Sequence, residues 1–160
     1  MSQNRALRQK KEIVRVPGDD IDYGLLNELV GFWVRRAEVR VMESFRQYLS
    51  SWAVSPTEVA ILIIVENNPG LSQIELAGAL NTDQSTVVNP LEHLETREFI
   101  ARSRLASDRR YQVLELTESG HDVVKQIKDA LLEHHNELTA ELSARERRAF
   151  MDLLKRFVQG

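Results

Sequence analysis

The chain has 160 residues, a formal net charge of -3 and no cysteine. This length suits one domain with a substantial core, and the missing thiols exclude disulfides, thiolate metal sites and cysteine-based redox sensing. No apolar run approaches the roughly 18 residues of a membrane-spanning helix, so we expect a cytoplasmic protein with no membrane partner.

The first twenty residues are basic. Over residues 1–16, Arg5, Arg8, Lys10, Lys11 and Arg15 stand against one acid, Glu12, and Pro17-Gly18-Asp19-Asp20 separates them from the rest of the chain. The pattern predicts a flexible basic arm over residues 1–20. Two roles stay open for it, a solubilising tail or an arm that adds contacts to DNA phosphates.

A long helix is predicted from Asp22 to about Leu49. Apolar residues recur there at helical spacing and form one broad stripe. The stripe consists of Leu26, Val30, Trp33, Ala37, Val41, Phe45 and Tyr48. A helix this apolar needs more burial than one small domain supplies, so we expect two protomers to share it.

Two arginines of this helix, Arg36 and Arg40, lie close to its apolar face. A buried arginine requires a partner. One possibility is an ion pair with an acid of the other protomer or of the C-terminal helices. The other is an effector site, in which Arg36 and Arg40 clamp a carboxylate or phosphate while Trp33 and Phe32 stack on an aromatic body.

The segment from Ser55 to Leu94 predicts three further helices. Ser55-Pro56-Thr57-Glu58 is a capping box that opens an apolar core helix, and Ser72 with Glu75 opens a second helix to about Leu80. A polar break with Thr82 as N-cap precedes a third helix, and this spacing is typical of a helix-turn-helix. Short polar side chains near the start of the third helix are candidates to contact base edges or phosphates: Gln84, Ser85, Thr86 and Asn89.

Two extended runs follow, one from Phe99 and one over residues 111–116, and they predict a β-hairpin. Its tip is basic, with Arg102, Arg104, Arg109 and Arg110 against Asp108 alone. Such a tip suits phosphate contacts or entry into a narrow minor groove, although ordinary surface arginines are the alternative. The acids concentrate after Leu116, so the net negative charge does not exclude DNA binding.

Two more helices are predicted, from the N-cap Thr117 to about Leu142 and from the capping box Ser143–Glu146 to about Val158. Their apolar faces suit packing on the N-terminal helix, as a dimerisation region. His121, Glu133, His134 and His135 lack good metal-ligand spacing, and we read them as solvated helix surface. No catalytic motif or cofactor motif is present, so we expect neither an enzyme nor a bound metal or cofactor.

An ordered set of motifs resembles the multiple-antibiotic-resistance regulator (MarR) family of bacterial transcription factors. The set is Ser85-Thr86, Leu94-Glu95, Phe99-Ile100, Asp108-Arg109-Arg110 and Leu116-Thr117-Glu118-Ser119-Gly120. The resemblance implies that Arg110 enters the minor groove, that Asp108 orients it, and that the protein is a homodimer. The chain departs from the family pattern at Asn89, at Glu98, where glycine is usual, and at Pro90, where we expect a kink in the helix.

Together these features predict a mainly α protein with a small β-hairpin, a winged helix-turn-helix flanked by dimerisation helices. The expected boundaries are the arm at 1–20 and a MarR-like domain at 21–160, with the winged helix at 55–117 and dimerisation helices at 22–50 and 118–158. We expect a homodimeric repressor that binds a double-stranded DNA operator and is released by a small organic anion, such as an aromatic carboxylate. The alternative is a winged-helix module for protein interaction without an operator of its own.

Overall fold

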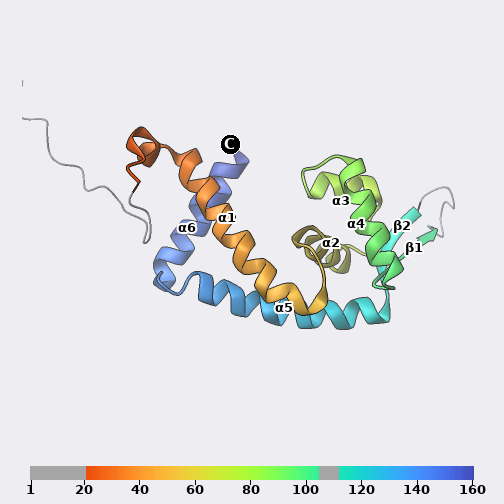
Figure 1. The fold of residues 1–160 in the computed structure, drawn as a ribbon. Coiled ribbons are helices and arrows are strands. Elements are labelled where there is room, and N and C mark those ends of the chain that lie inside the picture. The colour runs from red at the N-terminus through yellow and green to blue at the C-terminus, as the bar shows by residue number, and fades with distance from the viewer. Residues whose placement is uncertain (1–20, 105–111) are drawn as a thin grey trace, which may run out of the picture. The chain divides into compact units, whose positions relative to one another are not determined.

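The computed structural model describes residues 21–104 and 112–160. The chain divides into two compact units at Arg40, so the described residues before Val41 belong to the first unit and the rest to the second. The first unit holds the 3-10 helix η1 (Gly24–Glu28) and the start of α1 (Val30–Leu49). The second holds the end of α1 and all later elements (Figure 1). These are η2 (Ser50–Trp52), α2 (Pro56–Asn67), α3 (Gln73–Ala79), α4 (Gln84–Thr96), β1 (Ile100–Arg104), β2 (Gln112–Leu116), α5 (Glu118–Leu138) and α6 (Ala144–Gln159).

The predicted N-terminal helix is present, but the prediction that it begins at Asp22 is wrong. Gly24 has a φ of 50°, and its amide donates to Asp22 Oδ1 over 2.9 Å, so the segment starts as a tight turn. Leu29 is extended, with φ -96° and ψ 121°. This extended residue interrupts the helical hydrogen bonding, and α1 therefore begins only at Val30.

The core of the second unit forms around α2. Ser55 and Glu58 make the predicted capping box, and Pro56 occupies the first turn. Val59, Ile61, Leu62 and Val65 are at most 2% exposed, which confirms α2 as the core helix. Side chains from the neighbouring elements complete this core: Leu49, Leu76, Ala77, Val87, Leu91, Leu94, Ile100, Leu114, Val123, Val124 and Ile127.

No single helix within residues 21–104 and 112–160 is long and apolar enough to cross a membrane. Val30–Trp52 and Pro56–Asn67 satisfy the length and composition of a span only as a bent pair. The apolar side chains of α2 are already accounted for by the core that they form.

The turn between α3 and α4 is a Schellman motif, which explains why the predicted N-cap is wrong. Asn81 has a φ of 50°. Its amide donates to the Gly78 carbonyl and the Thr82 amide donates to the Ala77 carbonyl, each with a donor–acceptor distance of 3.0 Å. Thr82 is thereby used to end α3. Asp83 becomes the N-cap of α4 instead.

The predicted hairpin is confirmed as the antiparallel pair β1 and β2. Its register runs from Ile100 opposite Leu116 to Arg104 opposite Gln112. On its other side β2 meets the loop before α3, where the Leu114 amide donates to Leu71 O over 2.8 Å. The hairpin is therefore fixed at its base by backbone hydrogen bonds on both sides of β2.

The end of α4, the base of the hairpin and the start of α5 meet at one point. A second Schellman motif ends α4, with Glu98 at a φ of 58°. The Thr117 amide donates to Phe99 O over 3.1 Å, and Thr117 Oγ1 caps α5 by accepting from the Gly120 amide over 3.0 Å. A β-carbon at Gly120 would lie 2.0 Å from the Phe99 carbonyl oxygen, so only glycine fits this contact.

The C-terminal helices begin where predicted, but α5 ends at Leu138, four residues before the predicted Leu142. Reading His134 as solvated surface is also wrong, because His134 is 5% exposed. Its ring packs edge-on against Phe45 and Tyr48, with ring centroids 5.7 and 5.1 Å away. A hydrogen bond to Glu137, aided by burial, raises the pKa of Tyr48 to about 12.

We predict that Gly120→Ala lowers the free energy of unfolding by about 1–3 kcal/mol, because the added methyl group overlaps the Phe99 carbonyl. Gly78→Ala in α3 is the matched control. No atom outside α3's own backbone lies within 4 Å of its β-carbon position, so the same change there should be neutral or stabilise by up to about 1 kcal/mol. Urea unfolding measures the free energy of unfolding of both variants. Equal stabilities would contradict the close contact between Gly120 and the Phe99 carbonyl.

We also predict a pH-dependent contribution from Glu58. Burial of this carboxyl group raises its pKa, but hydrogen bonds from Ser55 and His93 outweigh burial and leave the pKa lowered. A lowered carboxyl pKa stabilises the fold at neutral pH, and that stability is lost as the pH falls through the folded pKa.

The gap in unfolding free energy between wild type and Glu58→Gln should therefore be largest near neutral pH and shrink below about pH 4. Glu75→Gln is the control. Glu75 makes the same capping bonds but is exposed, so this substitution should give a smaller gap in unfolding free energy. Denaturant unfolding at a series of pH values measures both gaps, and a constant gap for Glu58→Gln would refute the assignment.

Candidate DNA interface

The N-terminal half of α4 presents a polar surface. Gln84, Ser85, Thr86 and Asn89, the four residues predicted to meet DNA, are all exposed. On the opposite face Val87, Leu91 and Leu94 are fully buried. Ser85 and Asn89 are four residues apart and share one helix face, so α4 brings the predicted residues together in one short stretch.

Pro90 lies inside α4, and the helix continues without a break to Thr96. A proline has no amide hydrogen, so the Thr86 carbonyl receives no helical hydrogen bond from position 90. The residues that face solvent at 84–89 are therefore joined to the rest of α4 by a weakened turn. The kink expected at Pro90 stays a prediction.

The predicted basic wing lies only partly within the described residues. Arg102 and Arg104 are in β1, whereas Asp108, Arg109 and Arg110 lie outside the described residues. Arg102 Nε is 2.9 Å from Glu95 Oε1, so this arginine pairs with α4. Sequence patterns did not indicate Glu95 as its partner, because the two residues are on different elements and are joined by a tight turn.

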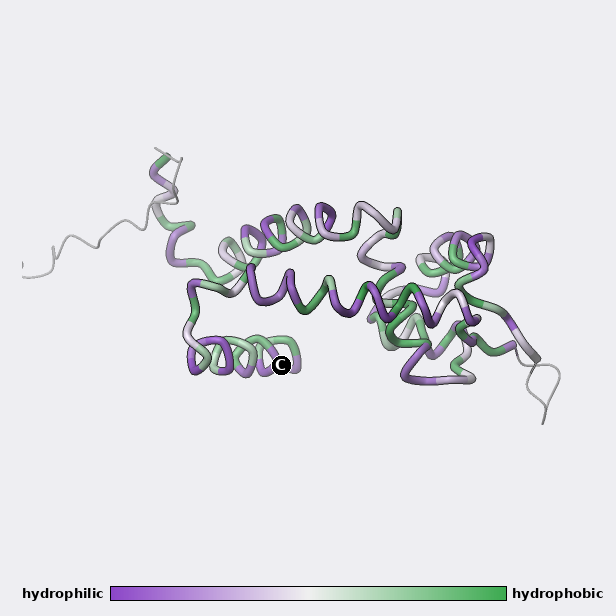
Figure 2. Tube along the Cα trace, turned by 90° about the horizontal axis from the view of Figure 1, so that it is seen from below, coloured by the Kyte–Doolittle hydropathy of each residue, from purple (hydrophilic) through white to green (hydrophobic). Residues whose placement is uncertain are grey.

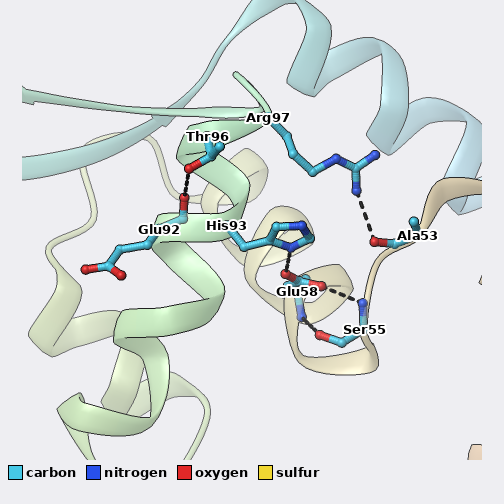
Figure 3. A network of polar contacts seen from close by, with 7 residues as sticks. All are labelled: Ala53, Ser55, Glu58, Glu92, His93, Thr96 and Arg97. Atoms are coloured by element: carbon cyan, nitrogen blue, oxygen red, sulfur yellow. Dashed lines mark hydrogen bonds and ion pairs between the residues drawn. The ribbon is translucent and has the colours of Figure 1, made fainter.

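The C-terminal half of α4 is linked to the start of α2 and to the loop before it (Figure 3). His93 Nδ1 contacts Glu58 Oε1, and Arg97 Nη1 donates to the carbonyl of Ala53 over 3.1 Å. Glu58 Oε2 accepts from the Ser55 amide over 2.6 Å. Figure 3 shows both α4 side chains directed toward the same short segment, residues 53–58. These contacts join residues 35 and 44 positions apart, and no sequence motif predicted them.

The predicted effector residues lie in the first unit. Arg36 Nη1 donates to Tyr23 Oη over 3.1 Å, and the guanidinium carbon is 5.2 Å from the Tyr23 ring centroid and 5.6 Å from that of Phe32. The Trp33 indole donates to the Asn27 carbonyl over 3.0 Å and packs edge-on against Phe32. Arg40, by contrast, is exposed on α1. Tyr23 is a partner of Arg36 that neither sequence interpretation foresaw.

The described residues hold no group of three or more His, Asp or Glu side chains placed to bind a metal ion. The exposed side chains at the start of α4 carry hydroxyl and amide groups, and Arg102 of β1 carries a guanidinium. Such groups suit hydrogen bonding to bases and phosphates.

Comparison with known proteins gives a consistent result. Residues 54–111 match the model of the MarR family. A putative transcriptional regulatory protein for the hcr operon of Thauera aromatica is 32% identical over 138 residues, which cover 86% of this chain and 83% of that protein.

Two solved structures of one repressor share the fold. The transcriptional repressor CouR, bound to a 23-mer DNA duplex, is 30% identical with a TM-score of 0.83, covering 88% of this chain and 99% of that one. CouR bound to p-coumaroyl-CoA is 28% identical with a TM-score of 0.79, and the match covers 87% of this chain and 98% of that one.

BpsR of Bordetella bronchiseptica, whose DNA binding is regulated by 6-hydroxynicotinic acid, is 26% identical with a TM-score of 0.77. The match covers 83% of this chain and 95% of that one. These matches agree with the helix-turn-helix and the hairpin. They confirm the family predicted from sequence and the expectation that the protein is not an enzyme. The chain belongs to the MarR family of DNA-binding transcriptional regulators.

Proposed function

We propose that this regulator is a homodimeric cytoplasmic repressor, held on its operator until a small aromatic acid, free or as a thioester, releases it. The observation that carries the proposal is the exposed polar half of α4, a helix that packs against β1. The sequence between the two strands adds Arg109 and Arg110. A chain 30% identical over almost its whole length is a repressor bound to DNA, which supports the same role here.

The proposed contacts divide between the two grooves and the backbone. Gln84, Ser85, Thr86 and Asn89 face the major groove, where their short donors and acceptors read base edges. Arg110 enters the minor groove and Asp108 orients it. Arg102, Arg104 and Arg109 bind phosphates, and Arg102 must then exchange Glu95 for a phosphate oxygen. The N-terminal arm over residues 1–20 can add further phosphate contacts.

Apolar surface supports the dimer. Leu153 and Phe157 of α6 are 58% and 61% exposed, and all residues of α6, which lie within the described part of the chain, are at least partly exposed. Hydrophobic and hydrophilic residues alternate along this helix (Figure 2). Leu25 and Val30 near the start of the described chain are also exposed. Large apolar side chains on helices at both ends of the chain suit burial against a second copy.

The effector is proposed to bind near Trp33, Arg36 and Arg40, as an aromatic anion. The aromatic rings of Tyr23 and Phe32 lie against the Arg36 guanidinium, and Trp33 packs edge-on against Phe32. A guanidinium beside aromatic rings is the chemistry that holds a planar carboxylate or thioester. Structural relatives bind p-coumaroyl-CoA or respond to 6-hydroxynicotinic acid. Release follows if the effector prefers a dimer geometry that misplaces the two α4 helices.

We predict that Arg110→Ala weakens binding to DNA from directly upstream of the chain's own coding sequence. The slope of log affinity against log salt should fall by about one, because one phosphate-side cation is lost. Lys125→Ala is the matched control, since it removes one exposed positive charge from α5 instead. Gel shifts at several salt concentrations measure the slopes.

The mass of the wild-type complex with one duplex should correspond to two chains. Unchanged affinity of Arg110→Ala would contradict the wing assignment. Absence of any salt-sensitive binding by the wild type would favour the alternative, a protein-interaction module.

We further predict that p-coumaroyl-CoA or 6-hydroxynicotinic acid raises the melting temperature. A ligand at 100 times its dissociation constant adds about 2.7 kcal/mol, which corresponds to several degrees for a chain of this size. Arg36→Gln and Arg40→Gln should reduce the shift. Arg35→Gln is the control, because Arg35 pairs with Glu38 on the exposed surface of α1. A full shift in the Arg36 and Arg40 variants would disprove this site.

A further inference from the structure

The recognition helix α4 has two halves that are held differently. The four residues proposed to meet DNA, Gln84, Ser85, Thr86 and Asn89, all precede Pro90, whereas the side-chain bonds to residues 53–58 come from His93 and Arg97, which follow it. The first half contacts the core through Val87, and the second half through Leu91 and Leu94. The halves meet at the turn where Pro90 leaves the Thr86 carbonyl without its helical donor.

Glu58 provides the first of the two long-range bonds. Its side chain is 7% exposed, and each carboxylate oxygen has a separate role: Oε2 accepts from the Ser55 amide and Oε1 contacts His93. A buried carboxylate that loses a partner incurs a large desolvation penalty. Because of this penalty, α4 cannot shift away from α2 freely while Glu58 is ionised.

Arg97 provides the second bond, at the end of α4. Its guanidinium donates to Ala53 O, and its central carbon is 4.5 Å from the centroid of the Phe99 ring at the base of the hairpin. Ala53 has a φ of 48°, a left-handed conformation that persists only where surrounding contacts fix it. Arg97 thus joins the loop after η2 to both α4 and the hairpin.

We propose that His93 and Arg97 are positioning residues for DNA binding, which lock the C-terminal half of α4 to residues 53–58 so that residues 84–89 keep one orientation. This inference rests on the proposed function, in which those residues meet the operator. The locked segment follows directly after α1 and η2, so these two side chains connect α4 to the part of the chain that leaves α1.

The test measures operator affinity of the full chain with duplex DNA from upstream of its own coding sequence. His93→Ala should bind about tenfold more weakly, which corresponds to about 1.4 kcal/mol. Its salt slope should match that of the wild type, because His93 positions α4 and does not neutralise a phosphate. His93→Asn keeps a donor at the Nδ1 position and should bind within about twofold of wild type.

A double-mutant cycle with Glu58→Gln should be non-additive, because both variants break the same contact. Arg97→Ala should also weaken binding, and Arg97→Lys should restore part of it. His121 is an exposed histidine of α5, so His121→Ala is the control for the loss of a histidine and should bind the operator DNA with wild-type affinity. Thermal unfolding of each variant identifies those that are folded at the assay temperature.

Three results would overturn the inference while leaving the proposed function intact. The first is wild-type operator affinity in both folded His93→Ala and Arg97→Ala, and the second is a salt slope lowered by about one in His93→Ala. The third is an operator affinity of His93→Asn as low as that of His93→Ala. The first two are the results expected of an inert contact and of a direct phosphate contact. A wild-type chain that shows no salt-sensitive binding would instead overturn the proposed function, and this inference with it.

Discussion

The carbonyl groups of Glu98 and Phe99 hold the DNA-binding unit together. The Glu98 carbonyl accepts from the hydroxyls of Thr117 and Ser119, and the Phe99 carbonyl accepts from the Thr117 amide and packs against Gly120. Three elements, α4, the hairpin and α5, therefore share two consecutive peptide groups. The direction in which the hairpin leaves α4 is set by backbone, and it requires Glu98 to adopt a left-handed conformation that usually favours glycine.

Local structure was predictable where the signal lies within one turn. The capping boxes at Ser55, Ser72 and Ser143 each satisfy two backbone donors over four residues, so the sequence alone places the starts of α2, α3 and α6. Prediction failed at Thr82 and at Asp22. In both places the outcome depends on a residue with positive φ, Asn81 or Gly24, and apolar spacing carries no information about that angle.

The contacts that position the candidate site were not predictable. Periodicity identifies the buried face of α4, but it does not identify Glu58 as the partner of His93 or Ala53 as the partner of Arg97. His134 shows the same limit: adjacent polar residues suggested solvent, and the fold places this ring between Phe45 and Tyr48. The exposed residues of α4 were found correctly because their position depends only on which helix face is apolar.

The distribution of charge around the hairpin limits how DNA can approach. Glu95, Glu98 and Glu118 line a shallow hollow at the base of the hairpin together with Thr117 and Ser119. Arg102 reaches Glu95 there, so the arginine nearest the base is partly neutralised. Carboxylates at the base of the hairpin repel phosphates. This acidic base agrees with the proposal that DNA approaches from the first half of α4, because the same acids disfavour an approach over the base of the hairpin.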